Sequence, residues 1–512
     1  MGSVGIEDDH AGVSHLRVLD DCRPDDNTLQ AFMVSKPRGF LPRADPIWQL
    51  PPEFEPLESI LQRMPVRTAS GEPGLLAHGK LGPTVDAEFP DLTWAVDKHR
   101  DNLPLMNALY RDYSFLLSAY LLEPCHERFM RGEPYGLGRQ RLPAVVARPM
   151  ARVAELTGFM PFMEYAGSYA LYNYKLVDPA KGMDYDNIRL IRAFEHGLDH
   201  TSSEAGFVLV HIDMVKHSGP LVSGTVEALE ATHKSREALN AAMGKQLEAL
   251  KKINATTINP HNFPPDKPSQ METMWMKSKP RDYTSFRTFI FGITSQSMFP
   301  DGVVYEGVNG GEPMSFRGES GANDSMIPLM DNFLQIPMPE TPLTEILNDF
   351  RKYRPSNHRE FLQGVRDEAR EVGLRGYVLR LGGKSSSSGG GGSGGGGDEK
   401  GEEEEAVWES RRLWLRLLDQ VREFRWRHWC FGKEYILKMT SHPTATGGSP
   451  IVTWLPNQLS AVLSDMINIA GEVGEEGLGR EVQDIMDLVR RQEETLRKEV
   501  EKYCEERGVG RS

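Results

Sequence analysis

The stretch WESRRLWLRLLDQVREFRWRHWCFGKEYILKM, residues 408–439, decides the fold because it carries a histidine inside an otherwise apolar helical stripe. The stripe follows the 3.6-residue period of one helix face. Its members follow one another at steps of four, three, four, three and four: Leu417, Val421, Phe424, His428, Phe431 and Tyr435. The spacing predicts a helix with one buried face, and it places His428 on that face.

Two interpretations of His428 are open at this point. A buried imidazole needs a partner for each ring nitrogen, so one interpretation is a core histidine bonded to a carbonyl or a carboxylate. The other is an axial ligand to the iron of a flat, apolar macrocycle that packs against Phe424 and Phe431. Arg425 lies one turn before His428 on the same side of the helix, where its guanidinium could meet a carboxylate.

Length and charge limit the number of domains and the kinds of partner that the chain can have. The chain has 512 residues, which exceeds the usual size of a single domain and predicts either two packed domains or one domain with long insertions. Its formal net charge is -14, and no long basic stripe with interleaved aromatic residues occurs, so we do not expect nucleic acid as a partner. No apolar run approaches the roughly 18 residues of a membrane span.

The cysteines and the N-terminal residues indicate the compartment. Four cysteines are scattered without a C-x-x-C pair, which argues against a disulfide framework or a zinc site. The start of the chain lacks the basic and apolar regions of a secretory signal. We therefore expect a cytoplasmic protein without a membrane segment. We also expect a monomer.

Composition divides the chain into regions. Residues 1–55 are polar and rich in proline, which predicts an extended strap. Residues 56–200 are expected to form a smaller N-terminal helical domain, and residues 201–512 a larger all-helical domain. Residues 382–405 are a Gly/Ser/Glu segment and are predicted to be a flexible insertion. Because strand-like alternation is scarce, the predicted class is mainly α.

Several segments together resemble the indoleamine 2,3-dioxygenase family, whose members are haem enzymes that open the pyrrole ring of tryptophan. The matching motifs occur in the family's order from about residue 161 to 449, on both sides of the insertion. They are YA at 165–166, EAGFVLV at 204–210, DYTSFRTFIFG at 282–292, DGVVYEG at 301–307, FRGES at 316–320, RKYRPSNHREFL at 351–362, REFRWRHW at 422–429 and TGG at 446–448.

The resemblance implies a fold and a cofactor. It implies a smaller N-terminal domain packed on a larger all-helical domain, with haem b between them and His428 as the proximal iron ligand. In the family the arginine three residues before this histidine pairs with an aspartate near the haem propionates. These two residues correspond to Arg425 and Asp331 here.

The resemblance also implies substrate-binding residues. Arg287 takes the position of the family's substrate-carboxylate arginine, and a planar guanidinium matches a carboxylate bidentately. Tyr283, Phe207 and Tyr165 would line the indole pocket. Small residues around Ser320 would follow the haem edge, and Thr446 belongs to a glycine-rich loop that would close over the substrate and meet its ammonium group.

The sequence also departs from the family pattern. His211 stands where many members have serine, and Asp282 stands where an aromatic residue is common. His211 is a candidate catalytic residue that could hydrogen-bond either the indole N–H or the iron-bound oxygen. The alternative is that His211 faces another helix instead of the pocket.

The expected reaction is the addition of O2 to L-tryptophan or a related indoleamine to give N-formyl-L-kynurenine. This reaction is the first step of the kynurenine route of tryptophan catabolism and de novo NAD synthesis. The alternative function is a haem-containing oxygen sensor of the same fold without turnover.

Overall fold

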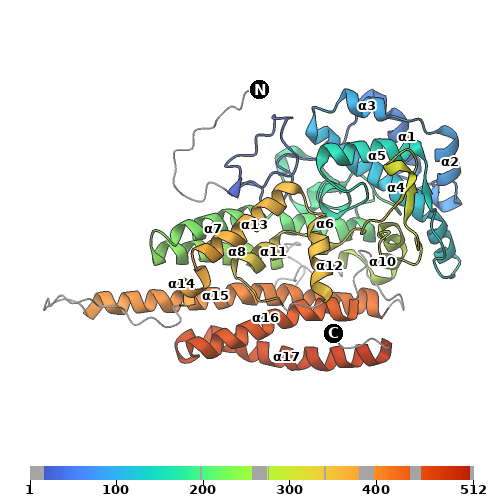
Figure 1. The fold of residues 1–512 in the computed structure, drawn as a ribbon. Coiled ribbons are helices and arrows are strands. Elements are labelled where there is room, and N and C mark those ends of the chain that lie inside the picture. Colours follow the sequence, from blue (N-terminus) through green and yellow to red (C-terminus); the bar gives the residue numbers. More distant parts are fainter. Residues whose placement is uncertain are drawn as a thin grey trace.

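The computed structural model describes residues 16–196, 199–255, 274, 276–338, 342–379, 397–438 and 451–507. Helices dominate these residues, and a smaller N-terminal unit packs on a larger helical one (Figure 1). The predicted mainly α class is confirmed. Within the described ranges, every helix is too short or too polar to cross a membrane.

The N-terminal domain is built around helix α4 (Leu103–Met130), which is buried along most of its length. Asn102 caps it by accepting a hydrogen bond from Leu105 N at 3.1 Å. A helix that is apolar on all sides needs cover on all sides. The helices of this part are α1 (Glu55–Arg63), α2 (Leu81–Glu88), α3 (Thr93–Lys98), α4 and α5 (Ala144–Thr157).

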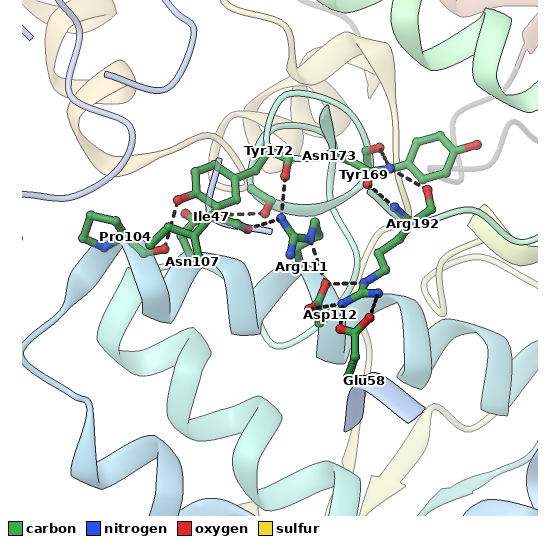
Figure 2. A network of polar contacts seen from close by, with 11 residues as sticks. Ile47, Glu58, Pro104, Asn107, Arg111, Asp112, Tyr169, Tyr172, Asn173 and Arg192 are labelled. Atoms are coloured by element: carbon green, nitrogen blue, oxygen red, sulfur yellow. Dashed lines mark hydrogen bonds and ion pairs between the residues drawn. The ribbon is translucent and has the colours of Figure 1, made fainter. Parts of the chain in front are cut away.

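A buried ionic network ties this domain together (Figure 2). Asp112 on α4 accepts from Arg111 Nε at 2.8 Å and from Arg192 Nη2 at 2.8 Å. Arg192 also reaches Glu58 on α1, at 2.5 Å. The network therefore joins α1, α4 and the segment just before the predicted boundary near residue 200.

The larger unit stacks long helices in layers. Figure 1 shows α15, α16 and α17 side by side in orange and red, with α7 and α8 above them. The helices are α6 (Ser203–Val215), α7 (Ser218–Ala231), α8 (Arg236–Asn254), α10 (Pro280–Phe286), α11 (Met326–Phe333), α12 (Pro342–Arg351), α13 (Ser356–Glu371), α14 (Leu374–Leu379), α15 (Gly397–Gly432), α16 (Ile451–Val473) and α17 (Gly479–Arg507).

Five short strands interrupt the helices. They are β1 (Arg141–Leu142), β2 (Tyr174–Leu176), β3 (Ile188–Leu190), β4 (Val303–Tyr305) and β5 (Pro313–Met314). β2 and β3 pair antiparallel, whereas β4 pairs parallel with β1 and antiparallel with β5. β4 and β5 belong to the part predicted as all-helical, and their pairing with β1 fastens them to the N-terminal domain.

The described part of the N-terminal strap, from Leu16 onward, is irregular and well packed. Arg43 is buried, and its guanidinium donates to the carbonyls of Gln30 at 3.0 Å and Leu29 at 3.1 Å. Val34 N donates to Asn357 Oδ1 on α13 at 2.6 Å. The strap therefore contacts the helix that carries the second half of the RKYRPSNHREFL motif.

Helix α15 carries the stretch that was expected to decide the fold. It begins at Gly397, so residues 397–405 of the predicted flexible insertion are helical instead. Glutamates have good helix propensity, and negative charge near a helix N-terminus is favourable. Residues 380–396 lie outside the described ranges. After Gly432 the chain continues in a π-helical turn, Lys433–Leu437.

Candidate active site

A cavity of about 840 Å³ lies between the α11–α13 region and helices α15 and α16, and α6 also reaches it. Cofactor and ligand sites commonly have volumes of about 300–1,000 Å³. His428 and His211 both line it, from α15 and α6. The cavity therefore brings together two imidazoles that are far apart in the sequence.

His428 is half-buried and faces this cavity. No hydrogen bond joins its ring to any side chain or carbonyl in the described part of the chain, and its ring centroid lies 6.3 Å from that of Phe424. Burial, the nearby His211 and the charge of Arg425 lower the pKa of His428 to about 4. The imidazole is therefore neutral at pH 7, with a lone pair available to a ligand in the cavity. A core histidine would be hydrogen-bonded, so this geometry favours the ligand interpretation.

Arg425 lies one helical turn before His428 and lines the same cavity. Its Nη2 donates to Asp331 Oδ2 on α11 at 2.7 Å, which is the contact that the resemblance implied. Its Nη1 donates to the carbonyl of Gln458 on α16 at 3.3 Å. Arg425 thus ties α15 to two neighbouring helices and places a cation beside His428.

His211 is presented by α6, which Ser202 caps by accepting a hydrogen bond from Ala205 N at 3.2 Å. The Nδ1 atom of His211 lies 2.8 Å from the carbonyl oxygen of Phe207. A carbonyl only accepts, so Nδ1 carries the hydrogen, and burial lowers the pKa of the ring and keeps it neutral. Nε2 is then a lone-pair acceptor. A Cβ added to Gly321 would stand 3.8 Å from Nε2, so this atom lies beside the small-residue loop.

Aromatic side chains pack against the ring of His211 and form a cluster with it. The ring centroid of Phe207 lies 5.0 Å from that of His211 and 5.2 Å from that of Tyr283. The ring centroid of Tyr165 lies 5.7 Å from that of His211. Tyr283 also hydrogen-bonds Arg287, whose Cζ lies 4.7 Å from the Phe291 ring centre. The structure therefore groups the predicted indole-pocket residues with the predicted carboxylate-binding arginine.

This cluster does not open onto the cavity. Arg287 has an exposed fraction of 0%, and the described residues that line the cavity do not include it or the three aromatic residues Tyr165, Phe207 and Tyr283. His211 touches both the cavity and the cluster. Asp282, next to Tyr283, accepts a hydrogen bond from Ser203 Oγ at 2.7 Å, which fixes α10 against α6.

Part of the small-residue loop borders the cavity, although Ser320 itself is not among the described lining residues. Gly321 and Ala322 line the cavity, while the half-buried Ser320 accepts a hydrogen bond from Ala322 N at 3.2 Å through its Oγ. Thr446 lies outside the described residues. Its role stays a prediction.

Glu319 and a set of basic residues lie near the site but were not identified from the sequence. Glu319 is a buried carboxyl beside the aromatic cluster, and burial raises its pKa to about 8. The basic residues form the basic wall of the cavity, which comprises Arg351, Lys352, Arg354, Arg359, Arg366 and Arg370. The density of basic residues in and after RKYRPSNHREFL was a visible signal for this wall.

Comparison with known proteins supports the resemblance. Residues 28–453 match the sequence profile of the family described as indoleamine 2,3-dioxygenase. The chain belongs to this family. The matched range includes His428, Arg425 and His211, and the indoleamine 2,3-dioxygenase family comprises haem-dependent enzymes that act on tryptophan and related indoles.

Relatives within the family are similar at a modest level. The chain is 25% identical to a 6-hydroxytryptophan 2,3-dioxygenase of Fusarium equiseti, over 66% of this chain and 74% of the relative. It is 25% identical to indoleamine 2,3-dioxygenase 2 of Homo sapiens, over 69% of this chain and 76% of the relative. It is 26% identical to indoleamine 2,3-dioxygenase 1 of Rattus norvegicus, over 66% of this chain and 74% of the relative.

Proposed function

We propose that this protein is a haem-dependent dioxygenase that opens the indole pyrrole ring of L-tryptophan or a related indoleamine with O2. The product of L-tryptophan would be N-formyl-L-kynurenine, the start of the kynurenine route. The observation that carries the proposal is the imidazole of His428, which has no hydrogen bond in the described part of the chain and faces a cavity of about 840 Å³. Membership of the family supports the same reaction class.

The residues of the cavity fit haem b. His428 offers a neutral imidazole, which is the form that binds iron. Phe424 and Leu455 supply apolar surface, and the basic wall supplies cations for the two carboxylates of the macrocycle. Bound haem would supply the activation of O2, while the protein supplies orientation, a pocket shielded from water and the placement of charge.

His211 would orient the indole. Its Nε2 is a lone-pair acceptor in the tautomer set by Phe207, so it can accept the indole N–H. In this tautomer it has no hydrogen to donate toward oxygen. Of the two roles that the sequence left open, the geometry therefore favours the hydrogen bond to the indole N–H.

Arg287, Tyr283, Phe207 and Tyr165 would hold the rest of the substrate. The guanidinium would pair with the substrate carboxylate and the aromatic rings would enclose the indole. Because this cluster is closed toward the cavity, its side chains must move apart when the substrate enters beside His211. Ser320 and Thr446 would complete the binding site from the haem edge and the closing loop.

The same closed cluster favours a second candidate function, a haem-containing oxygen sensor without turnover. In a sensor the cavity would hold haem, and Arg287 would serve only the packing of Tyr283 and Phe291. Product formation separates the two functions, because both require haem but only the dioxygenase consumes tryptophan.

The test is reconstitution with haem, followed by tryptophan, a reductant and air in the same cuvette. We expect the spectrum of a histidine-ligated haem and the appearance of formylkynurenine. His428→Ala should lose both the spectrum and the product, whereas His233→Ala, at an exposed position after α7, should keep both. Haem binding without product would support the sensor, and absence of haem from the wild type would refute both functions.

A further inference from the structure

Arg354 is a buried cation in the wall of the cavity, between α12 and α13. Its exposed fraction is 3%, and it lines the cavity directly. Its Nη2 donates to the carbonyl of Ala322 in the small-residue loop at 3.1 Å. Its Nε is buried and has no hydrogen-bond partner in the described part of the chain. A buried charged donor without an acceptor is costly, so an acceptor is expected from outside the chain.

The two acidic residues nearby, Asp324 and Asp331, each bind another group through Oδ2, while their Oδ1 atoms are buried and have no hydrogen-bond partner in the described part of the chain. Asp324 Oδ2 accepts from Met326 N at 2.9 Å and so caps α11. Asp331 Oδ2 is bound to Arg425. Within the described ranges no carboxylate forms an ion pair with Arg354. Burial and the charge of Arg351 lower the pKa of Arg354 to about 10, so the guanidinium is still cationic at pH 7.

The rest of the wall adds positive charge. α13 presents Arg359, Arg366 and Arg370 at spacings of seven and four residues, which is one helix face. Among the described residues that line the cavity, the carboxylates are Asp324 and Asp331. The local excess of cations contrasts with the net charge of -14 of the whole chain. The cavity is therefore suited to an anionic ligand.

We infer that Arg354 binds a carboxylate that a ligand brings into the cavity, and that this carboxylate is one of the two propionates of haem. The inference rests on the proposed function, because it requires haem in this cavity. A guanidinium has a planar fork of donors that matches a carboxylate. Arg425 is already shared with Asp331 and Gln458, which leaves Arg354 as the buried donor with free capacity.

A substrate carboxylate is the other possible source of the same chemistry. The expected carboxylate partner of the substrate is Arg287, and this residue lies in the closed cluster rather than in the cavity wall. Haem, by contrast, would occupy the cavity that Arg354 lines. The porphyrin is therefore the preferred source, and the experiment separates the two.

The test is a titration of the full-length apoprotein, followed by the haem absorbance band, for the wild type and Arg354→Gln. Haem and its dimethyl ester, which has no free carboxylates, are used as probes. We expect Arg354→Gln to weaken haem binding about tenfold or more and to leave the affinity for the ester within about twofold, because only the charged ligand loses a charge-assisted bond.

Matched variants keep the result specific. The glutamine introduced by Arg354→Gln retains a side-chain N–H for the Ala322 carbonyl, and the melting temperature of the apoprotein reports whether the loop survives the change. Arg354→Lys keeps the charge and should recover part of the haem affinity. Arg359→Gln removes an exposed cation of the same wall and should change haem affinity less than Arg354→Gln.

Several outcomes would overturn the inference. Equal haem affinities of wild type and Arg354→Gln would do so, and equal losses for haem and the ester would show a structural role instead. An unchanged haem affinity with weaker binding of tryptophan, but not of tryptamine, would assign Arg354 to the substrate carboxylate. If the wild type binds no haem, the proposed function fails and the inference fails with it.

Discussion

At the scale of single residues, one hydrogen bond defines the chemistry of His211. The Phe207 carbonyl accepts from Nδ1 at 2.8 Å, so Nε2 is left as an acceptor toward the cavity. A serine at this position could donate or accept, because its hydroxyl rotates. The histidine is restricted to accepting while it stays neutral. This restriction predicts a preference for substrates that carry an indole N–H.

We expect the haem-loaded enzyme to prefer tryptophan over 1-methyltryptophan, which lacks this hydrogen. One lost hydrogen bond is worth about 1 kcal/mol, or roughly fivefold in kcat/KM. The preference should shrink in His211→Ala, which removes the acceptor. The measurement is the ratio of kcat/KM for the two substrates in both proteins. An unchanged ratio would show that His211 does not contact the indole nitrogen.

At the scale of elements, the ion pair between Arg425 and Asp331 joins α15 to α11. Arg425 has an exposed side-chain fraction of 7%, so removing its carboxylate partner would leave a buried charge without compensation. We expect Asp331→Asn to lower the free energy of unfolding of the apoprotein by about 3 kcal/mol. Urea unfolding measures this change.

The matched control for this pair is Asp367→Asn on the exposed face of α13, which should change the unfolding free energy by less than about 0.5 kcal/mol. In the double variant Asp331→Asn with Arg425→Met, much of the loss should be recovered because the unpaired charge is gone. If Asp331→Asn destabilises no more than Asp367→Asn, the pair does not hold the two helices together.

A second element-scale prediction concerns the Asp112 network of Figure 2. Burial alone would raise the pKa of the Asp112 carboxyl, but Arg111 and Arg192 outweigh it and hold the pKa at about 2, below the ordinary 3.8. As the pH falls, the unfolded state therefore takes up the proton first. The stabilising contribution is complete above about pH 4 and is lost as the pH falls toward 2.

Asp112→Asn should thus cost about 3–5 kcal/mol at pH 7, and the difference from wild type should shrink by about 1 kcal/mol at pH 3, because the folded-state pKa of about 2 is not yet reached there. Urea unfolding at pH 7, 5 and 3 tests this dependence. Asp101→Asn, at a side chain that is 97% exposed, is the control. A difference that does not depend on pH would mean that the Asp112 charge does not stabilise the fold.

At the scale of the whole molecule, α14 and α15 contact each other directly on either side of the Gly/Ser-rich segment. α15 contacts the rest of the protein from about Ala406 onward, where the Ala406 carbonyl accepts from Asn240 Nδ2 at 2.9 Å, and Gly401–Glu405 are exposed. Arg411 Nε donates to the Leu379 carbonyl at 3.1 Å, so the end of α14 lies near the middle of α15.

We expect deletion of residues 386–395 to leave the melting temperature within about 2 °C, since shortening a loop by about this much changes its closure entropy by less than about 1 kcal/mol. Between the end of α14 and the start of α15 the deletion leaves seven residues, which can span roughly 23 Å when extended. The distance they must cover is roughly 21 Å, the length of α15 from its start to Arg411, beside which α14 ends. Thermal unfolding and haem titration of the deletion variant provide the measurement. A large loss of either would show that the segment takes part in the fold or the site.

Local patterns in the sequence were enough to predict the helices and the position of His428. The apolar stripe from Leu417 to Tyr435 repeats at the helical period, so any packed structure had to bury that face of α15. The mainly α class followed from the same kind of local signal. The N-terminal end of α15 was not predicted, because the glycines before it indicated a flexible segment up to residue 405. The helix instead begins at Gly397 and includes the exposed glutamates that follow.

Contacts between distant residues were decided only by the tertiary structure. Nothing local places Arg354 against the Ala322 carbonyl or closes the cluster of Phe207, Tyr283 and Arg287 off from the cavity. These arrangements depend on how α6, α10 and α13 pack around α15. Helical periodicity specifies which face of each helix is buried, whereas the neighbour it is buried against depends on the packing of the whole molecule.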